Sequence, residues 1–171
     1  MTATQRLRAA WLVFVIALVG ATVGAVMLGG WQLQIKGRQL PPVADQVADR
    51  QAAIQAASTG TVKVLTYSPN TFEQDSSAAE ALLTGDFLTH YKNFTSTIVA
   101  TAAREKGITT SATISGAGVE SLTSQTGSLL IFVNQTTTSR DKPSPTVSAS
   151  SVQVGVRKVN GAWLIDRFNP V

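Results

Sequence analysis

The sequence predicts an α+β fold in which helices precede an antiparallel sheet, attached to one N-terminal transmembrane helix. Three observations support this prediction. A long uncharged stretch lies near the N-terminus, the following segments repeat apolar residues with a helical period, and the segments after Gly107 alternate apolar and polar residues as strands do. Because the helices come before the strands and do not alternate with them, the pattern favours an α+β layer fold.

The stretch from Ala9 to Trp31 contains no charged side chain. At about 1.5 Å per residue, a helix of this length measures roughly 34 Å and can cross a hydrocarbon core of about 30 Å. Trp11 and Trp31 stand at its two ends, where indole rings anchor helices at the membrane interface. We expect residues 9–31 to form an uncleaved span. The alternatives fit less well, because a core helix keeps a polar face and a signal peptide has a shorter apolar run.

Arg6 and Arg8 precede this span as basic interface anchors, and a long domain follows it. Long trailing domains cross the membrane largely regardless of their charge. We therefore expect residues 1–8 to be a short cytosolic leader, residues 32–42 a stem, and residues 43–171 one exported domain. The protein would then be a single-pass protein of the inner (plasma) membrane with a periplasmic or extracytoplasmic C-terminal domain.

Small residues gather on one face of the expected span, namely Ala17, Gly20, Ala21 and Gly24. Such a face allows the backbone of a second helix to approach closely. We expect helix–helix packing with a membrane partner at these positions. The alternative is that the small residues only reflect the general composition of membrane helices.

The formal net charge of +4 is concentrated beside this span. Four of the 14 basic residues precede Gln39, and the remaining ten are balanced by the ten acidic residues of the chain. Anionic headgroups are natural partners for the excess charge, so we expect contact with membrane lipid. No clustered stripe of Lys and Arg follows, so we expect no nucleic-acid partner.

The sequence also lacks the usual equipment of metal and thiol chemistry. It contains no cysteine and one histidine, His90. This composition excludes disulfides, thiolate nucleophiles and thiolate metal sites, and it provides no pair of histidines at metal-ligand spacing. We expect no metal ion and no cofactor.

Three helices are predicted in the exported domain. Val43, Val47, Ile54 and the alanines between them lie on one stripe of a long helix that ends at about Leu65. A serine at position 76 or 77, followed by Glu80, resembles the capped start of a short helix. The third helix runs from residue 86 to about residue 106. Its predicted apolar face consists of Phe87, Tyr91, Phe94 and Ile98.

Four strands are predicted after these helices, around residues 112–116, 129–133, 152–156 and 162–165. Asn160-Gly161 is the commonest form of a two-residue hairpin turn. The proline-containing segment from residue 139 to 145 is predicted to be a loop between two strands. Consecutive strands joined by short connections predict an antiparallel sheet.

Several motifs resemble those of the Mce-associated membrane proteins of actinobacteria. In chain order they are Leu65-Thr66-Tyr67, Leu82-Leu83-Thr84-Gly85-Asp86-Phe87 with Tyr91, Asn160-Gly161-Ala162-Trp163-Leu164-Ile165-Asp166, and Pro170-Val171. The resemblance implies a cone-shaped, NTF2-like (cystatin-like) domain in which the structural motif residues are Gly85, Phe87, Tyr91, Trp163 and Asp166. It further implies an accessory subunit or assembly factor of an Mce-type lipid import complex, with permease and Mce-domain proteins as its partners and no catalytic residues.

Two alternatives stay open beside the Mce interpretation. Similar anchored domains serve as assembly subunits of secretion-type apparatuses, and an NTF2-like cone can itself bind a lipid or steroid. A cavity of several hundred Å³ would favour lipid binding, whereas a packed cone would favour a scaffold. Trp163 and Phe168 are expected to be core or pocket-mouth aromatics.

An enzyme of this fold would need a buried acid beside a hydrogen-bond donor. The candidates are Asp86, Asp166, Tyr67, Tyr91 and His90. We expect Asp86 to serve a helix N-terminus, Asp166 to face solvent or to pair with the neighbours of Arg167, and His90 to point away from the apolar face of its helix. No catalytic residue is therefore predicted.

Overall fold

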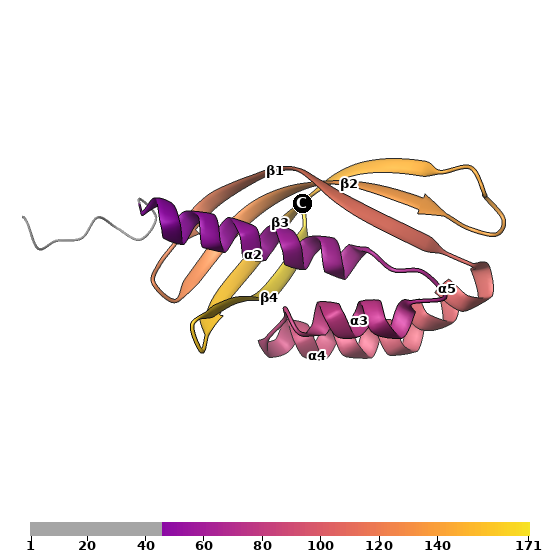
Figure 1. Cartoon of the computed structure of the whole chain (residues 1–171), viewed down its shortest axis with the longest axis horizontal. Helices are drawn as coiled ribbons and strands as arrows, with labels where there is room; N and C mark the ends of the chain where they lie inside the picture. Colours follow the sequence, from indigo (N-terminus) through magenta and orange to yellow (C-terminus); the bar gives the residue numbers. More distant parts are fainter. Residues whose placement is uncertain (1–45) are drawn as a thin grey trace, which may run out of the picture. The chain divides into compact units, whose positions relative to one another are not determined.

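The computed structural model of the chain describes residues 46–171. The leader, the membrane span with its packing face and interface anchors, and the stem lie outside the described residues, as does the expected helix start at Val43. Within residues 46–171, none of the helices combines the length and the apolar character needed to cross a bilayer. In this part, helices come first and strands follow (Figure 1).

The elements confirm the predicted order of helices and strands. They are the helices α2 (Val47–Leu65), α3 (Phe72–Glu80), α4 (Gly85–Phe94), the π-helix η2 (Thr95–Val99) and α5 (Ala100–Lys106), then the strands β1 (Thr109–Leu122), β2 (Thr126–Thr138), β3 (Thr146–Val159) and β4 (Ala162–Pro170). Because α4, η2 and α5 follow one another directly, they act as one long helix, and the described part contains three helices.

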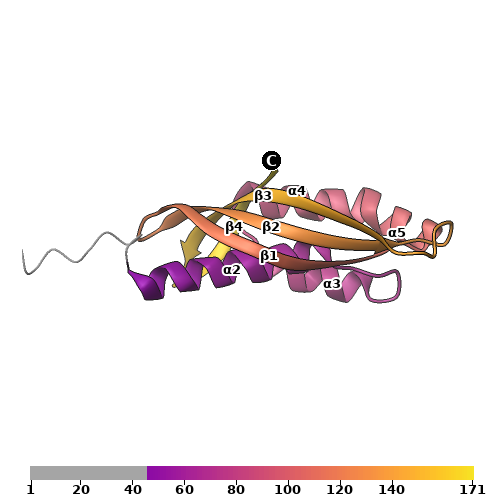
Figure 2. The same ribbon diagram turned by 90° about the horizontal axis from the view of Figure 1, so that it is seen from above.

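The four strands form one sheet in the order β1-β2-β3-β4, and every neighbouring pair is antiparallel. The long helix α2 contacts β1 and β4, whereas α4 contacts β4. Figures 1 and 2 show α2 running along the sheet and α3 lying beside the α4–α5 helix. Three helices on a four-stranded antiparallel sheet confirm the predicted α+β, NTF2-like fold.

The core lies between α2 and the sheet, and alternation along the strands builds its sheet side. Leu129, Ile131 and Val133 of β2 are at most 1% exposed, whereas Phe132 between them is 46% exposed. On β3, the side chains of Val152 and Val154 are buried in the same way. The alternation predicted for both strands is therefore confirmed.

The face of α2 that meets the sheet consists of small residues. Ala53, Ala57, Gly60 and Thr61 are buried, whereas Val47, predicted to lie on the apolar stripe, is 69% exposed. A Cβ atom at Gly60 would lie 2.5 Å from Cδ1 of Ile165 on β4. The absence of a side chain at Gly60 thus lets the helix approach the sheet closely. Ala53 and Ile54 of the predicted stripe do pack on the core, so the prediction is wrong for Val47.

The start of α3 differs from the prediction. The helix begins at Phe72, and the Ser76 hydroxyl lies mid-helix, where it donates to the carbonyl oxygen of Phe72 at 2.8 Å. Phe72 is 4% exposed, and the hydroxyl of Thr71 donates to the Asp75 carboxylate one turn later at 2.6 Å. Burial of Phe72 and the polar contact of Thr71 therefore mark the helix start, and the predicted start at Ser76 or Ser77 is wrong.

A wide turn at η2 shifts the apolar face of the third helix. Phe94 and Ile98, predicted to lie on the inner face, are 56% and 54% exposed. Thr95 is buried instead, and its hydroxyl donates to the Tyr91 carbonyl oxygen at 2.6 Å. A π-turn contains one more residue than an α-turn, so a regular 3.6-residue period fails at Ile98. Phe94 precedes the turn and still lines the same pocket as Phe87 and Tyr91.

The two predicted connections are confirmed. Asn160 and Gly161 have φ values of 50° and 85°, as a two-residue turn of type I′ requires. The loop from residue 139 to 145 joins β2 to β3, and Arg140 ties it to the end of α5. The Arg140 amide donates to the Lys106 carbonyl oxygen at 2.8 Å and its guanidinium to the Glu105 carbonyl oxygen at 3.1 Å. A cation at this end also complements the helix dipole.

Candidate functional site

An apolar pocket of about 510 Å³ lies between the helices and the sheet. This volume falls in the size class of small-molecule sites. Aromatic side chains form much of its lining, namely Tyr67, Phe72, Phe87, Tyr91, Phe94 and Phe168. The domain therefore contains a cavity of several hundred Å³, the feature that favours ligand binding over a packed scaffold.

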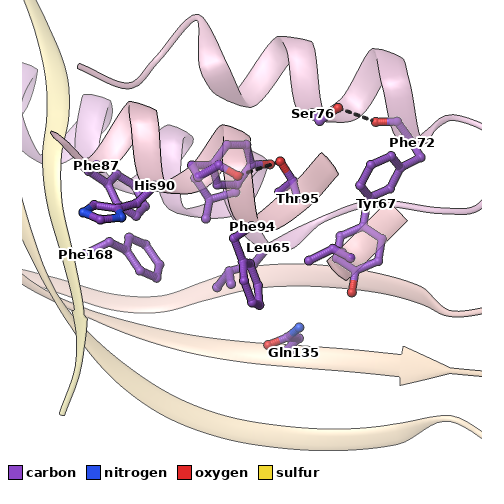
Figure 3. A pocket seen from close by; sticks show the side chains of 13 residues that line it. Leu65, Tyr67, Phe72, Ser76, Phe87, His90, Phe94, Thr95, Gln135 and Phe168 are labelled. Atoms are coloured by element: carbon purple, nitrogen blue, oxygen red, sulfur yellow. Dashed lines mark hydrogen bonds between the residues drawn. The ribbon is translucent and has the colours of Figure 1, made fainter. Parts of the chain in front are cut away.

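One end of the pocket is formed where α4 meets β4. The rings of Phe87 and Phe168 stack there with centroids 5.5 Å apart and planes inclined by 5°. His90 lies at the same end (Figure 3). The expectation that His90 points away is wrong, because a residue three positions after Phe87 shares its helix face.

The other end is formed where the chain leaves α2 and enters α3. Tyr67 is fixed on β1 by two backbone hydrogen bonds to Thr110, of 3.1 and 2.9 Å. Its ring meets that of Phe72 edge-on, with centroids 5.7 Å apart. Figure 3 shows Phe94 and Gln135 between the two ends, so the lining is elongated.

The polar groups of the pocket are of two kinds. The hydroxyls of Ser76 and Thr95 donate to carbonyl oxygens of their own helices. Within residues 46–171, by contrast, the hydroxyls of Tyr67 and Tyr91 and the side-chain amide of Gln135 take part in none of the protein hydrogen bonds. A bound molecule could pair with these groups.

Burial and nearby charge change the acidity of the pocket tyrosines. Desolvation raises the pKa of Tyr91 from 10.0 to about 12, with smaller contributions from the negative charges of Glu80 and Asp75. Desolvation also raises the pKa of Tyr67. Both phenols therefore keep their protons at neutral pH and can donate hydrogen bonds.

We expect the raised pKa of Tyr91 to make stability fall at alkaline pH. Between pH 10.0 and about 12, the unfolded chain releases the phenol proton while the folded chain retains it, so the free energy of unfolding decreases as pH rises. Tyr91→Phe removes this proton and should show a shallower decrease. Urea unfolding at about pH 9 and about pH 11 tests this linkage; identical pH dependence in both proteins would contradict it.

The candidate acids lie elsewhere. Asp86 and Asp166 line a separate polar depression together with Arg157 and Arg167. Among the described residues that line the apolar pocket, none is Asp, Glu, Lys or Arg. The structure thus separates the candidate acids from Tyr67 and from the other pocket candidates, and no acid–tyrosine pair forms there.

Asp166 takes part in ion pairs, so of the two alternatives predicted for it, exposure to solvent is wrong. Its side chain is 10% exposed, and its Oδ2 accepts a hydrogen bond from Nε of Arg157 at 3.1 Å. Its Oδ1 lies 2.7 Å from the position that a Cβ of Gly155 would occupy. The missing side chain of Gly155 on β3 therefore leaves room for the carboxylate to settle against the sheet.

The other motif residues have structural positions. Gly85 starts α4 with a φ of 62°, which glycine adopts at little cost. Just before it, the Thr84 amide donates to the Ile165 carbonyl oxygen at 2.8 Å, which joins the α3–α4 connection to β4. Trp163 is 8% exposed, and Nζ of Lys158 lies 5.2 Å from its ring centroid.

Sequence reasoning missed several pocket residues. Phe72 and Val99 were not predicted as pocket residues, and Gln135 lies beyond the alternating residues 129–133 from which its strand is predicted. The turn at residues 67–70 could have indicated Phe72, because an aromatic residue directly after a turn is a candidate helix anchor. The sequence carries no comparable signal for Gln135.

Solved structures with a similar fold include secretion-system subunits. An IcmL-like type IV secretion system protein from Legionella pneumophila gives a TM-score of 0.59 at 8% identity, covering 71% of this chain and 93% of that chain. CagV, a VirB8 homologue of the Helicobacter pylori type IV secretion system, gives 0.56 at 14% identity, covering 71% of this chain and 98% of that chain. At these identities the similarity shows a shared fold.

Relatives at higher sequence identity come from Mycobacterium tuberculosis. No protein-family model matches the chain. The protein Rv1362c is 48% identical over 121 residues, which cover 71% of this chain and 55% of that protein, so the chain spans about half the length of this relative. The outer membrane protein Rv1973 is 39% identical over 129 residues, which cover 75% of this chain and 80% of that protein. The chain therefore belongs to the same family as outer membrane protein Rv1973.

Proposed function

We propose that the chain is a non-catalytic subunit that assembles other proteins into a complex of the cell envelope. The observation that carries this proposal is the similarity of the described domain to solved chains of secretion-system subunits, which it covers almost completely, 93% for the IcmL-like chain and 98% for the CagV chain. The separation of the candidate acids from the pocket tyrosines agrees with a role in binding.

The outer side of the sheet is the surface that we assign to partner proteins. Phe132 is 46% exposed there, and Val147, at the start of β3, is 68% exposed. Arg140 holds the hairpin that carries Val147 against the end of α5. A stiff hairpin loses little conformational entropy on binding, which favours a docking role.

Anchoring in a membrane by residues 9–31 is part of the same proposal. The periplasmic fragment of TraM, with a TM-score of 0.58 at 8% identity over 70% of this chain and 95% of that chain, is a domain that works outside the cytoplasm. An exported domain on a membrane helix would place the present chain similarly. Packing of Gly20 and Gly24 on a partner helix would then add a contact within the membrane.

Membership of an Mce-type lipid import complex is the second candidate. The specific observation in its favour is the apolar pocket of about 510 Å³, because a scaffold alone needs no cavity. In this case the assembled partners would be permease and Mce-domain chains.

Affinity purification of the full chain from its own membranes in mild detergent tests the proposal. We expect a defined set of membrane-complex subunits by mass spectrometry, secretion-channel subunits in the first case and permease with Mce-domain chains in the second. Phe132→Asp should reduce this recovery, whereas Ile98→Asp, a matched change at an exposed apolar residue elsewhere, should not. Recovery of the chain without such subunits would refute the assembly role.

A further inference from the structure

We propose that the apolar pocket binds one neutral, elongated apolar molecule that carries a single hydroxyl or carbonyl group. This inference goes beyond the assembly role, because the pocket lies between the helices and the sheet, whereas the assigned protein surface is the outer side of the sheet. It depends on three properties of the pocket, namely its shape, its charge and its free polar groups.

The shape of the pocket suits a long molecule. The stacked Phe87–Phe168 pair closes one end and the edge-on Tyr67–Phe72 pair closes the other. Phe94 lies between them (Figure 3), and although it lines the pocket it is 56% exposed. A ligand that covers this ring would remove apolar area from water, which favours binding.

The side chains that line the pocket disfavour a ligand with an ionised carboxylate or phosphate group. The titratable groups in its lining are Tyr67, His90 and Tyr91, and none of its described lining residues is Lys or Arg. A buried carboxylate or phosphate would lose its hydration without gaining a Lys or Arg partner from the described lining, which is costly. The acidic groups Asp75 and Glu80 act on Tyr91 from nearby and add to this disfavour.

Free polar groups explain why the ligand should carry one oxygen atom. The Gln135 amide and the Tyr67 hydroxyl both belong to the lining, and neither makes a protein hydrogen bond within the described residues. Figure 3 shows the Tyr67 hydroxyl directed to the side of the pocket on which Gln135 lies. A hydroxyl or carbonyl oxygen placed there would satisfy groups that are otherwise partly buried without partners.

A matched pair of photoactivatable probes tests this inference on the full chain in lipid nanodiscs. One probe is a long-chain alcohol with a diazirine in its chain, and the other is the carboxylic acid with the same chain. We expect the alcohol to label peptides from residues 64–76 and 87–99, with about tenfold less labelling by the carboxylate. Because the label is located on the chain itself, the result does not depend on any partner protein.

Two variants with one control distinguish pocket binding from partition into lipid. Phe94→Ala should reduce labelling by the alcohol about tenfold, whereas Ile98→Ala, which shortens a similarly exposed apolar side chain that does not line the pocket, should leave it unchanged. A third probe, the alkane with the same chain and diazirine, isolates the contribution of the hydroxyl group. Gln135→Leu should abolish the preference for the alcohol over this alkane. Equal labelling by the alcohol and the carboxylic acid would overturn the proposal. Absence of label from both peptides, which is expected if a protein segment fills the pocket, would also overturn it.

Discussion

Replacing Gly60 with valine is expected to lower the free energy of unfolding by about 2–3 kcal/mol, as overpacking of a well-filled core does. A Cβ at this position would lie 2.5 Å from Cδ1 and 3.2 Å from Cγ1 of Ile165. Ile165 is 1% exposed, so its side chain cannot swing into solvent to make room. The helix α2 would have to move away from β4, and the contact between them would be lost.

A double-mutant cycle identifies the cause of this loss. Ile165→Val removes the Cδ1 atom and alone should cost about 0.5–1.5 kcal/mol. Combined with Gly60→Ala, it should cost less than the sum of the single changes, because the new methyl group occupies the space that Cδ1 leaves. Urea unfolding of the full chain, followed by circular dichroism, measures all four proteins.

A control on the same helix separates packing from helix propensity. Lys63 is exposed on α2, so Lys63→Val introduces the same side chain without contact to the sheet and should cost about 0.5 kcal/mol. If Gly60→Val and Lys63→Val were equally stable, the close approach of α2 to β4 would be wrong.

Truncation of Ile131 to alanine is expected to have the second large effect, a loss of about 2–5 kcal/mol. Ile131 lies on β2 and is fully buried between the sheet and the helices. Its partner on the neighbouring strand β3 is Val152. Its removal leaves a cavity beside side chains that cannot collapse into it, because the sheet backbone fixes their positions.

The neighbouring residue supplies the matched control. Phe132 lies on the opposite side of β2 and is 46% exposed, so Phe132→Ala should cost roughly 1 kcal/mol or less although it removes more atoms. Unfolding in urea distinguishes the two variants. A similar loss for both would mean that the alternation along β2 is assigned to the wrong faces.

Strands were readable from the sequence because alternation and turn chemistry act locally. The apolar residues at 129, 131 and 133 point inward in any sheet with one covered face, and Asn160-Gly161 has the backbone preference of its turn without help from the rest of the fold. These features depend on near neighbours, so the sequence contains the information needed.

The helical details depended on distant contacts and were harder to predict. The buried side of α2 is set by how closely Gly60 approaches Ile165, which lies more than a hundred positions later in the chain. The α3 start is set by burial of Phe72, and the exposure of Ile98 by the π-turn. None of these contacts has a local pattern of the kind that periodicity detects.

The pocket was foreseen as a possibility, but its lining was only partly predicted. Phe87 and Tyr91 were identified from the helix face and the family motif, and Phe168 was expected to be a core or pocket-mouth aromatic. Gln135 enters from β2, and its position depends on the register between strands and helices. Such a register is a property of the whole domain, which explains why a single sequence does not reveal it.

The π-turn at residues 95–99 divides the third helix into two halves that pack against different parts of the domain. Residues before it, such as Phe87 and Tyr91, face the pocket, whereas Ala100 and Ala103 after it pack with Phe72 in a second small core. Deleting one residue within the turn would restore regular α-helical winding. It would also rotate the part after the turn by about 100° relative to the part before it. In related proteins the length of this segment would therefore decide which side chains border the pocket, separately from the chemistry of the residues themselves.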